Sequence, residues 1–138
     1  LIDRTGVLLG LDFPAGKALD VLAREAGHVN GYQVKLEDLS FSLSGMENQV
    51  KALAERGTSP AEIARFALET VAGTVCRVTK EAKARYPGLP VLYSGGVASN
   101  SLLRQALPEG VFARPEYSTD NAMGPAILAW RSRKGDVQ

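Results

Sequence analysis

Two turns, about twenty residues apart, are the part of the sequence best suited to chemistry: one contains two glycines and the other an acidic residue. Residues 91–93 form a short apolar run, Gly95 and Gly96 follow it, and Asn100 precedes a helical pattern. A Gly-Gly turn lets the backbone approach a phosphate closely, and the N–H groups of the next helix point at it. A second acidic turn, around Asp120, stands ahead of another helix. Together the two turns suggest a nucleotide site with a metal ion beside it.

Each of these residues also has a simpler structural interpretation. Gly95 and Gly96 could form a plain turn between a strand and a helix, and Asn100 could cap that helix. Asp120 could stabilise a helix N-terminus, where carboxylates interact with the helix dipole. Spacing alone leaves both interpretations open.

Three positions nearer the start of the chain are equally ordinary by themselves. Asp3 could be a surface carboxylate, Gly16 a turn glycine, and Asp20 an acid in the first turn of a helix. His28 is the single histidine, and one histidine cannot form a histidine-rich zinc site within this chain. It is expected in a surface loop. Cys76 lies in a helical stripe and is expected to be a buried, inert thiol.

Composition is that of an ordinary soluble globular protein. Of the 138 residues, 45% are hydrophobic and 22% are charged, which suffices for one domain with a real core. The formal net charge of +1 gives no general electrostatic footprint for nucleic acid or membrane. A lone cysteine excludes an internal disulfide and favours a cytoplasmic location. No apolar run is long enough to span a bilayer.

The hydrophobic pattern predicts alternating helices and short strands, and hence an α/β fold. Helices are expected over 1–9, 17–26, 46–56, 60–86, 101–107 and 121–133, and strands over 39–43, 91–93 and 111–113. Ser59, Pro60 and Glu62 provide an N-cap, a first-turn proline and a capping box, so helix 60–86 is the expected core helix. Strand 91–93 is expected to be buried on both faces. Ligands of such sheets lie beyond the carboxyl ends of the strands, which would bring both turns to one edge.

Four motifs span almost the whole chain. They are residues 2–5 with 9–16, residues 41–45, residues 94–100 with Leu103-Arg104, and residues 115–123. In this order they resemble the motifs of the threonylcarbamoyl-adenosine tRNA transferase family, whose members have also been called glycoproteases or O-sialoglycoprotein endopeptidases. Each motif is modest alone, but jointly they are specific.

The resemblance implies the C-terminal lobe of an actin-like, sugar-kinase-like ATPase fold. Residues 1–138 would be that single lobe, and the N-terminal lobe of a longer, two-lobed protein would be absent, in line with a sequence that starts at Leu1 inside a helical pattern. The whole protein would move a threonylcarbamoyl group to tRNA adenosine, with ATP or threonylcarbamoyl-adenylate in the cleft between its lobes. The isolated chain is expected to be inactive and to self-associate through the apolar surface left by the missing lobe.

The same resemblance assigns the site residues. The nucleotide or adenylate would contact Asp3, Gly16, Asp20, Gly95, Gly96 and Asn100. Asp120 would be this lobe's one ligand to a divalent iron or zinc ion, and the other metal ligands would belong to the missing lobe.

Three departures from the family's motifs point to a divergent paralogue. Leu43 replaces an aromatic residue, a Pro-Gly-Gly-Pro turn becomes Pro-Ala-Gly-Lys at 14–17, and Pro125 stands early in the last helix. Two alternatives to a transferase therefore stay open: a non-catalytic scaffold that pairs with a true transferase, and a metalloendopeptidase. With one histidine and no His-Glu-x-x-His motif, the sequence gives the peptidase no support.

Overall fold

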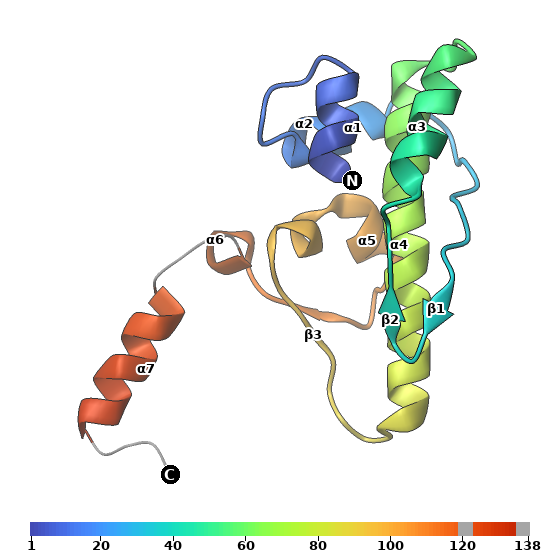
Figure 1. Ribbon diagram of the computed structural model, residues 1–138. Coiled ribbons are helices and arrows are strands. Elements are labelled where there is room, and N and C mark those ends of the chain that lie inside the picture. Colours follow the sequence, from blue (N-terminus) through green and yellow to red (C-terminus); the bar gives the residue numbers. More distant parts are fainter. Residues whose placement is uncertain (119–122, 135–138) are drawn as a thin grey trace.

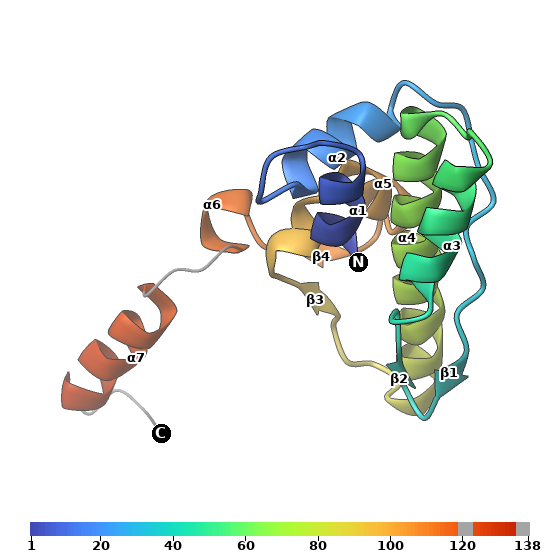
Figure 2. The same cartoon turned by 45° about the horizontal axis from the view of Figure 1, so that its top comes forward.

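The computed structural model describes residues 1–118 and 123–134 and has a mixed α/β architecture dominated by helices. The long helix α4 (Pro60–Arg85) is its axis (Figure 1). Against α4 pack α1 (Ile2–Leu8), α2 (Gly16–Ala23), α3 (Met46–Glu55) and α5 (Ser101–Ala106). Turning the molecule leaves this grouping unchanged, and α7 (Met123–Lys134) stands apart from it in both views (Figure 2).

In the described part of the chain, four short strands form two separate pairs. β1 (Leu36–Glu37) and β2 (Ser40–Phe41) are antiparallel, and β3 (Leu92–Tyr93) and β4 (Val111–Phe112) are parallel. The 3-10 helix η1 (Gly96–Ser99) follows β3, and the single turn α6 (Pro115–Ser118) follows β4. The carboxyl ends of β3 and β4 therefore open towards the same edge, as the sequence predicts.

The core forms where α4 meets its neighbours. One cluster joins α2, α4 and α5 through the buried residues Leu19, Ala23, Ala64, Leu68 and Leu102. A second cluster joins α3 to α4 through Val50, Ile63 and Ala67. Small residues on α4 let the surrounding helices approach closely, so α4 is the core helix that its apolar stripe predicts.

The start of α4 is fixed by its capping box. The Glu62 N–H donates to Ser59 Oγ over 3.3 Å, and the Ser59 N–H donates to Glu62 Oε2 over 3.3 Å. Pro60 occupies the first turn, and the helix ends at Arg85 with Tyr86 as its C-cap. These bounds confirm the predicted helix.

Three predicted elements are wrong in extent or burial. Helix 17–26 stops at Ala23, because the N–H groups of Arg24 and Glu25 bond three residues back rather than four. Strand 39–43 shortens to β2, because Asp38 and Leu39 have φ of 48° and 65° and form the turn of the hairpin.

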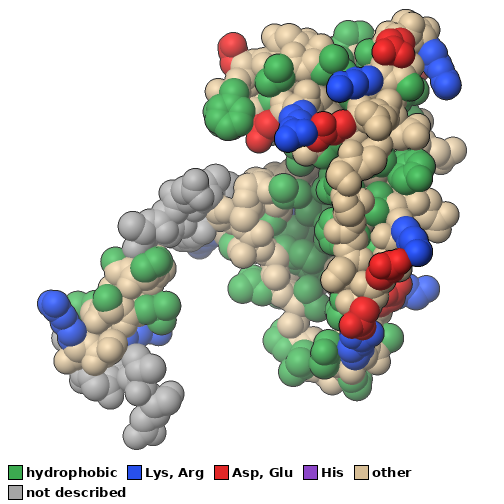
Figure 3. Space-filling model, viewed as in Figure 1, with side chains coloured by type: hydrophobic (Ala, Val, Ile, Leu, Met, Phe, Trp, Pro, Cys, Tyr) green, Lys and Arg blue, Asp and Glu red, His purple; other side chains and the backbone are tan. Residues whose placement is uncertain are grey.

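The burial expected for β3 is also wrong. Leu92 is 67% exposed, and its β4 neighbour Val111 is 58% exposed. Among the residues that the structure describes, β3 pairs with β4 and no other strand, so it is not an interior strand of a wider parallel sheet. Figure 3 shows hydrophobic side chains on this face, over the segment that leads from α4 into β3.

Membrane spanning receives no support from the described ranges. Every helix within 1–118 and 123–134 is either too short or too polar to cross a bilayer.

Replacing Ser59 with alanine tests the capping box. We expect Ser59→Ala to lower the free energy of unfolding by about 1 kcal/mol at pH 7. The Glu62 N–H loses its acceptor Ser59 Oγ, and the reciprocal bond from the Ser59 N–H to Glu62 is weakened. Urea denaturation followed by circular dichroism measures it, with Ser40→Ala on β2 as the control. An unchanged midpoint would contradict the role of the box.

The same comparison has a defined pH dependence. Hydrogen bonds from Ser59 lower the pKa of the Glu62 carboxyl. Stabilisation by this carboxylate is therefore complete above its unfolded-state pKa and is lost as pH falls through the lowered folded-state pKa. We expect the difference between wild type and Ser59→Ala to shrink over that acidic window.

Candidate functional site

The glycine turn that follows β3 has a geometry that other residues adopt poorly. Gly95 has a φ of +95°, in the region that favours glycine, and its carbonyl accepts from the Ala98 N–H over 3.0 Å to begin η1. The turn therefore bends the chain sharply from β3 into η1. Gly96 lies at the start of η1, on the wall of a cavity.

Asn100 ends this turn and has two structural tasks. Its Oδ1 accepts from the Leu103 N–H over 3.0 Å, so Asn100 caps α5 as the simpler interpretation predicted. Its Nδ2 also donates to Asp20 Oδ1 over 2.8 Å. The side chain is thus held from both ends, in one orientation.

Asp20 is a buried carboxylate between α2 and α5, and it is 8% exposed. Besides the Asn100 amide, its Oδ1 accepts from Ser101 Oγ over 2.8 Å and from the Ser101 N–H over 3.2 Å. Its Oδ2 pairs with Arg24 Nη2 at 2.7 Å. Asp20 lies in the second turn of α2, so the first-turn position expected from the sequence is wrong. Its charge is fully engaged, as a buried carboxylate requires.

Asp3 joins α1 to the start of α2. Its Oδ1 accepts from the Ala15 N–H over 2.9 Å. Close approach of the two segments depends on Gly6, because a Cβ there would collide with the Cβ of Ala15. In the described part of the chain no hydrogen bond uses Asp3 Oδ2, which leaves that oxygen available as an acceptor.

These segments line an open cavity of about 470 Å³, a size typical of small-molecule sites. Five of the seven predicted site residues line it: Asp3, Gly16, Asp20, Gly96 and Asn100. The wall also contains the apolar residues Ile2, Pro14 and Val97, and the polar residues Lys17 and Ser99.

The two remaining predicted residues do not line this cavity. Gly95 adjoins it, one residue before Gly96. Asp120 lies outside the described residues. Within residues 1–118 and 123–134, no three histidine, cysteine, aspartate or glutamate side chains gather closely enough to hold a metal ion.

The chemistry of the cavity suits a nucleoside. A carboxylate oxygen can accept from paired ribose hydroxyls, and the apolar wall can contact a base. Ser99 Oγ is buried and has no hydrogen-bond partner among the described residues.

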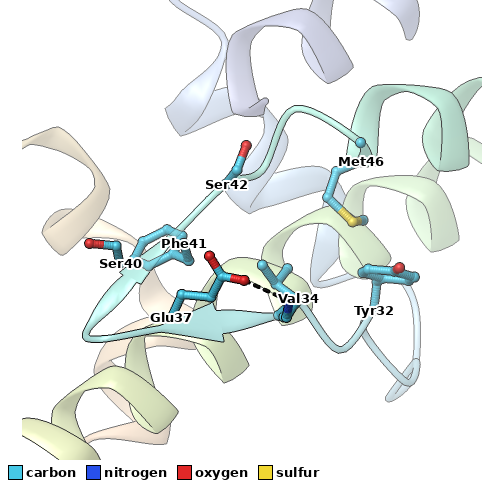
Figure 4. A pocket seen from close by; sticks show the side chains of 9 residues that line it. Tyr32, Val34, Glu37, Ser40, Phe41, Ser42 and Met46 are labelled. Carbon is cyan, nitrogen blue, oxygen red and sulfur yellow. Dashed lines mark ion pairs between the residues drawn. The ribbon is translucent and has the colours of Figure 1, made fainter.

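Two other cavities of about 430 Å³ lie elsewhere on the molecule. The first lies beside the β1–β2 hairpin, where Tyr32, Phe41 and Met46 surround it (Figure 4). Its one carboxylate, Glu37, is paired with Lys35 at 2.6 Å. The second lies between the end of α4 and the amino ends of β3 and β4. Neither contains a predicted site residue.

Arg104 is a supporting residue to which the sequence assigned no role. Its Nε donates to the Ala98 carbonyl over 3.0 Å, and its Nη2 donates to the Ala113 carbonyl over 3.0 Å. The guanidinium carbon lies 4.8 Å from the centre of the Phe112 ring. Arg104 thereby ties the glycine turn to the end of β4. Its inclusion in the third motif was the available signal.

The remaining reactive side chains lie elsewhere. His28 is exposed in a loop, as predicted, with Nδ1 3.3 Å from Glu69 Oε1. Cys76 is half-buried rather than buried, and burial raises the pKa of its thiol. A raised thiol pKa disfavours the reactive thiolate, in agreement with an inert role.

Comparison with known proteins identifies the family. The family model for tRNA N6-adenosine threonylcarbamoyltransferase matches residues 1–127. A curated protein of that name from Thermus thermophilus is 32% identical over 136 residues, which cover 94% of this chain and 42% of the relative. Another, from Desulfovibrio desulfuricans, is 31% identical over an alignment 160 positions long. That alignment covers 93% of this chain and 44% of the relative.

The chain therefore belongs to the tRNA N6-adenosine threonylcarbamoyltransferase family. This confirms the resemblance carried by the four motifs. The chain spans less than half the length of these curated relatives.

Removing the Asp20 carboxylate tests the link between α2 and α5. We expect Asp20→Ala to lower the free energy of unfolding by about 2 kcal/mol, because Asn100 Nδ2 and the Ser101 donors lose their acceptor. Urea denaturation at pH 7 measures it. Asp12→Ala, which removes an exposed carboxylate, is the matched control and should change stability little. Equal effects of the two substitutions would contradict the link.

Proposed function

We propose that this chain is the C-terminal lobe of a two-lobed transferase with an actin-like, sugar-kinase-like ATPase fold. The whole protein would transfer a threonylcarbamoyl group to an adenosine of tRNA in the cytoplasm. Family membership supports the reaction, and the coverage of 42% of a relative supports a further lobe. The observation that carries the proposal is the cavity in which Asp3, Gly16, Asp20, Gly96 and Asn100 meet.

In this proposal the cavity holds ATP or threonylcarbamoyl-adenylate. Asp3 Oδ2 would accept from the ribose hydroxyls while Oδ1 remains bonded to the Ala15 N–H. The turn at Gly95 and Gly96 would bring backbone close to the adenosine or its phosphate. Asn100 would present its remaining amide hydrogen, because Asp20 and α5 already fix its orientation.

Asp20 would act mainly by holding Asn100 in place. Asp120 would be one carboxylate ligand of a divalent iron or zinc ion, with the other ligands supplied from outside this chain. That assignment rests on the fourth motif, and the carboxylate is a suitable ligand type for either ion.

We also propose that the exposed apolar side chains of β3 and β4 are covered by the rest of the whole protein. In the isolated chain they would then drive self-association. Sedimentation velocity on the isolated chain should show a dimer or larger species that Leu92→Lys returns towards monomer. A monomeric wild-type chain at high concentration would contradict this.

Substitution of two aspartates in the full-length protein tests the proposed reaction. With unmodified tRNA and threonylcarbamoyl-adenylate, we expect Asp3→Asn to weaken adenylate binding about tenfold, because one acceptor of the ribose hydroxyls is lost. We expect Asp120→Ala to lower transfer at least about a hundredfold and to lower bound metal measured by mass spectrometry. Asp12→Asn is the control and should behave as wild type.

The outcomes separate the candidate functions. Adenylate binding without transfer would replace the transferase with the scaffold alternative. Wild-type protein that binds no adenine nucleotide would overturn the proposal. Cleavage of a glycoprotein by metal-loaded protein, abolished in Asp120→Ala, would revive the peptidase.

A further inference from the structure

Lys17 gives the cavity a positive charge. Among the described residues that line the cavity, it is the one with a basic side chain. That side chain is exposed, and in the described part of the chain it takes part in no ion pair. It also stands where the family resemblance leads us to expect proline. Lys17 is therefore a cation whose use the proposed function does not yet explain.

Two carboxylates line the cavity with Lys17, and they differ in how far their charge is compensated. Asp20 is offset by Arg24 at 2.7 Å and by the donors of Asn100 and Ser101. Asp3 lies on α1 and uses Oδ1 for the Ala15 N–H. A negatively charged ligand group near Lys17 would therefore meet this cation, a largely compensated Asp20, and the Asp3 carboxylate, whose free Oδ2 the proposed function assigns to the ribose hydroxyls.

The backbone around Lys17 adds donors of the same kind. Gly16, Lys17 and Ala18 form the first turn of α2, whose N–H groups lack partners within the helix. The N-cap residue is Ala15, which has no side chain able to accept from them, and no acidic residue occupies this first turn. Together with the lysine ammonium group, this turn offers one concentrated set of donors to an anion.

We propose that Lys17 recognises the phosphoryl group of the adenylate and thereby sets the preference of the cavity for nucleotides over nucleosides. The inference rests on the proposed function, because it requires an adenine nucleotide in this cavity. Asp3 on α1 would accept from the ribose, and Lys17 on α2 would pair with the phosphate. A lysine suits this task as a compact charge on a flexible stem.

Calorimetric titration of the full-length protein with AMP and with adenosine tests the assignment. We expect Lys17→Met to weaken AMP binding about tenfold and to change adenosine binding less than about twofold, since adenosine has no phosphate. Lys17→Arg should retain most of the AMP affinity. Lys80→Met removes an equal charge from an exposed position on α4 that lies outside the cavity lining, and should bind both ligands as wild type does. The advantage of wild type over Lys17→Met should shrink as salt is added.

Each other outcome overturns a defined part of the account. If Lys17→Met and Lys17→Gln, folded by thermal melting, weaken AMP and adenosine equally, Lys17 only balances Asp3 and the inference fails. If AMP binding is unchanged in both variants, the inference fails while the proposed function stands. If the wild-type protein binds neither ligand, the proposed function fails and this inference fails with it.

Discussion

The buried carboxylate of Asp20 joins two segments that lie 80 residues apart in the chain. A carboxylate removed from water needs compensating donors, and Asp20 finds them in Arg24, Asn100 and Ser101. The same contact fixes the Asn100 side chain, whose oxygen is committed to the cap of α5. One interaction therefore sets the distance between α2 and the glycine turn, and with it the width of the cavity between them.

Other contacts hold the remaining walls in register with this link. Gly6 lets α1 approach Ala15 closely enough for Asp3 to bond the start of α2. Arg104 bonds both the glycine turn and the end of β4, so the parallel pair and the turn are tied together. Beneath them, α4 provides the apolar surface on which α2 and α5 pack. The walls of this cavity are therefore held by helices rather than by loops alone.

Local signals in the sequence were sufficient for the elements that local interactions determine. The Ser59–Glu62 capping box located α4, and the capping role of Asn100 followed from its place before a helical pattern. The exposure of Leu92 could not be predicted, because burial of a strand depends on which other strands pair with it. The hairpin turn at Asp38 and Leu39 contains no glycine to indicate its positive φ. The candidate site residues followed from the resemblance to the family's motifs. The hydrogen bonds that Asn100 and Ser101 donate to Asp20 are long-range and had no sequence signal.

Glycine amides report most directly on whether the cavity between α1, α2 and the glycine turn binds an adenine nucleotide. In full-length protein labelled with ¹⁵N-glycine, added AMP should shift the amide resonances of Gly16, Gly95 and Gly96. Gly45, which lines the cavity beside the β1–β2 hairpin, should stay unmoved. Shifts confined to Gly45, or saturating binding that leaves Gly16, Gly95 and Gly96 unchanged, would contradict the account.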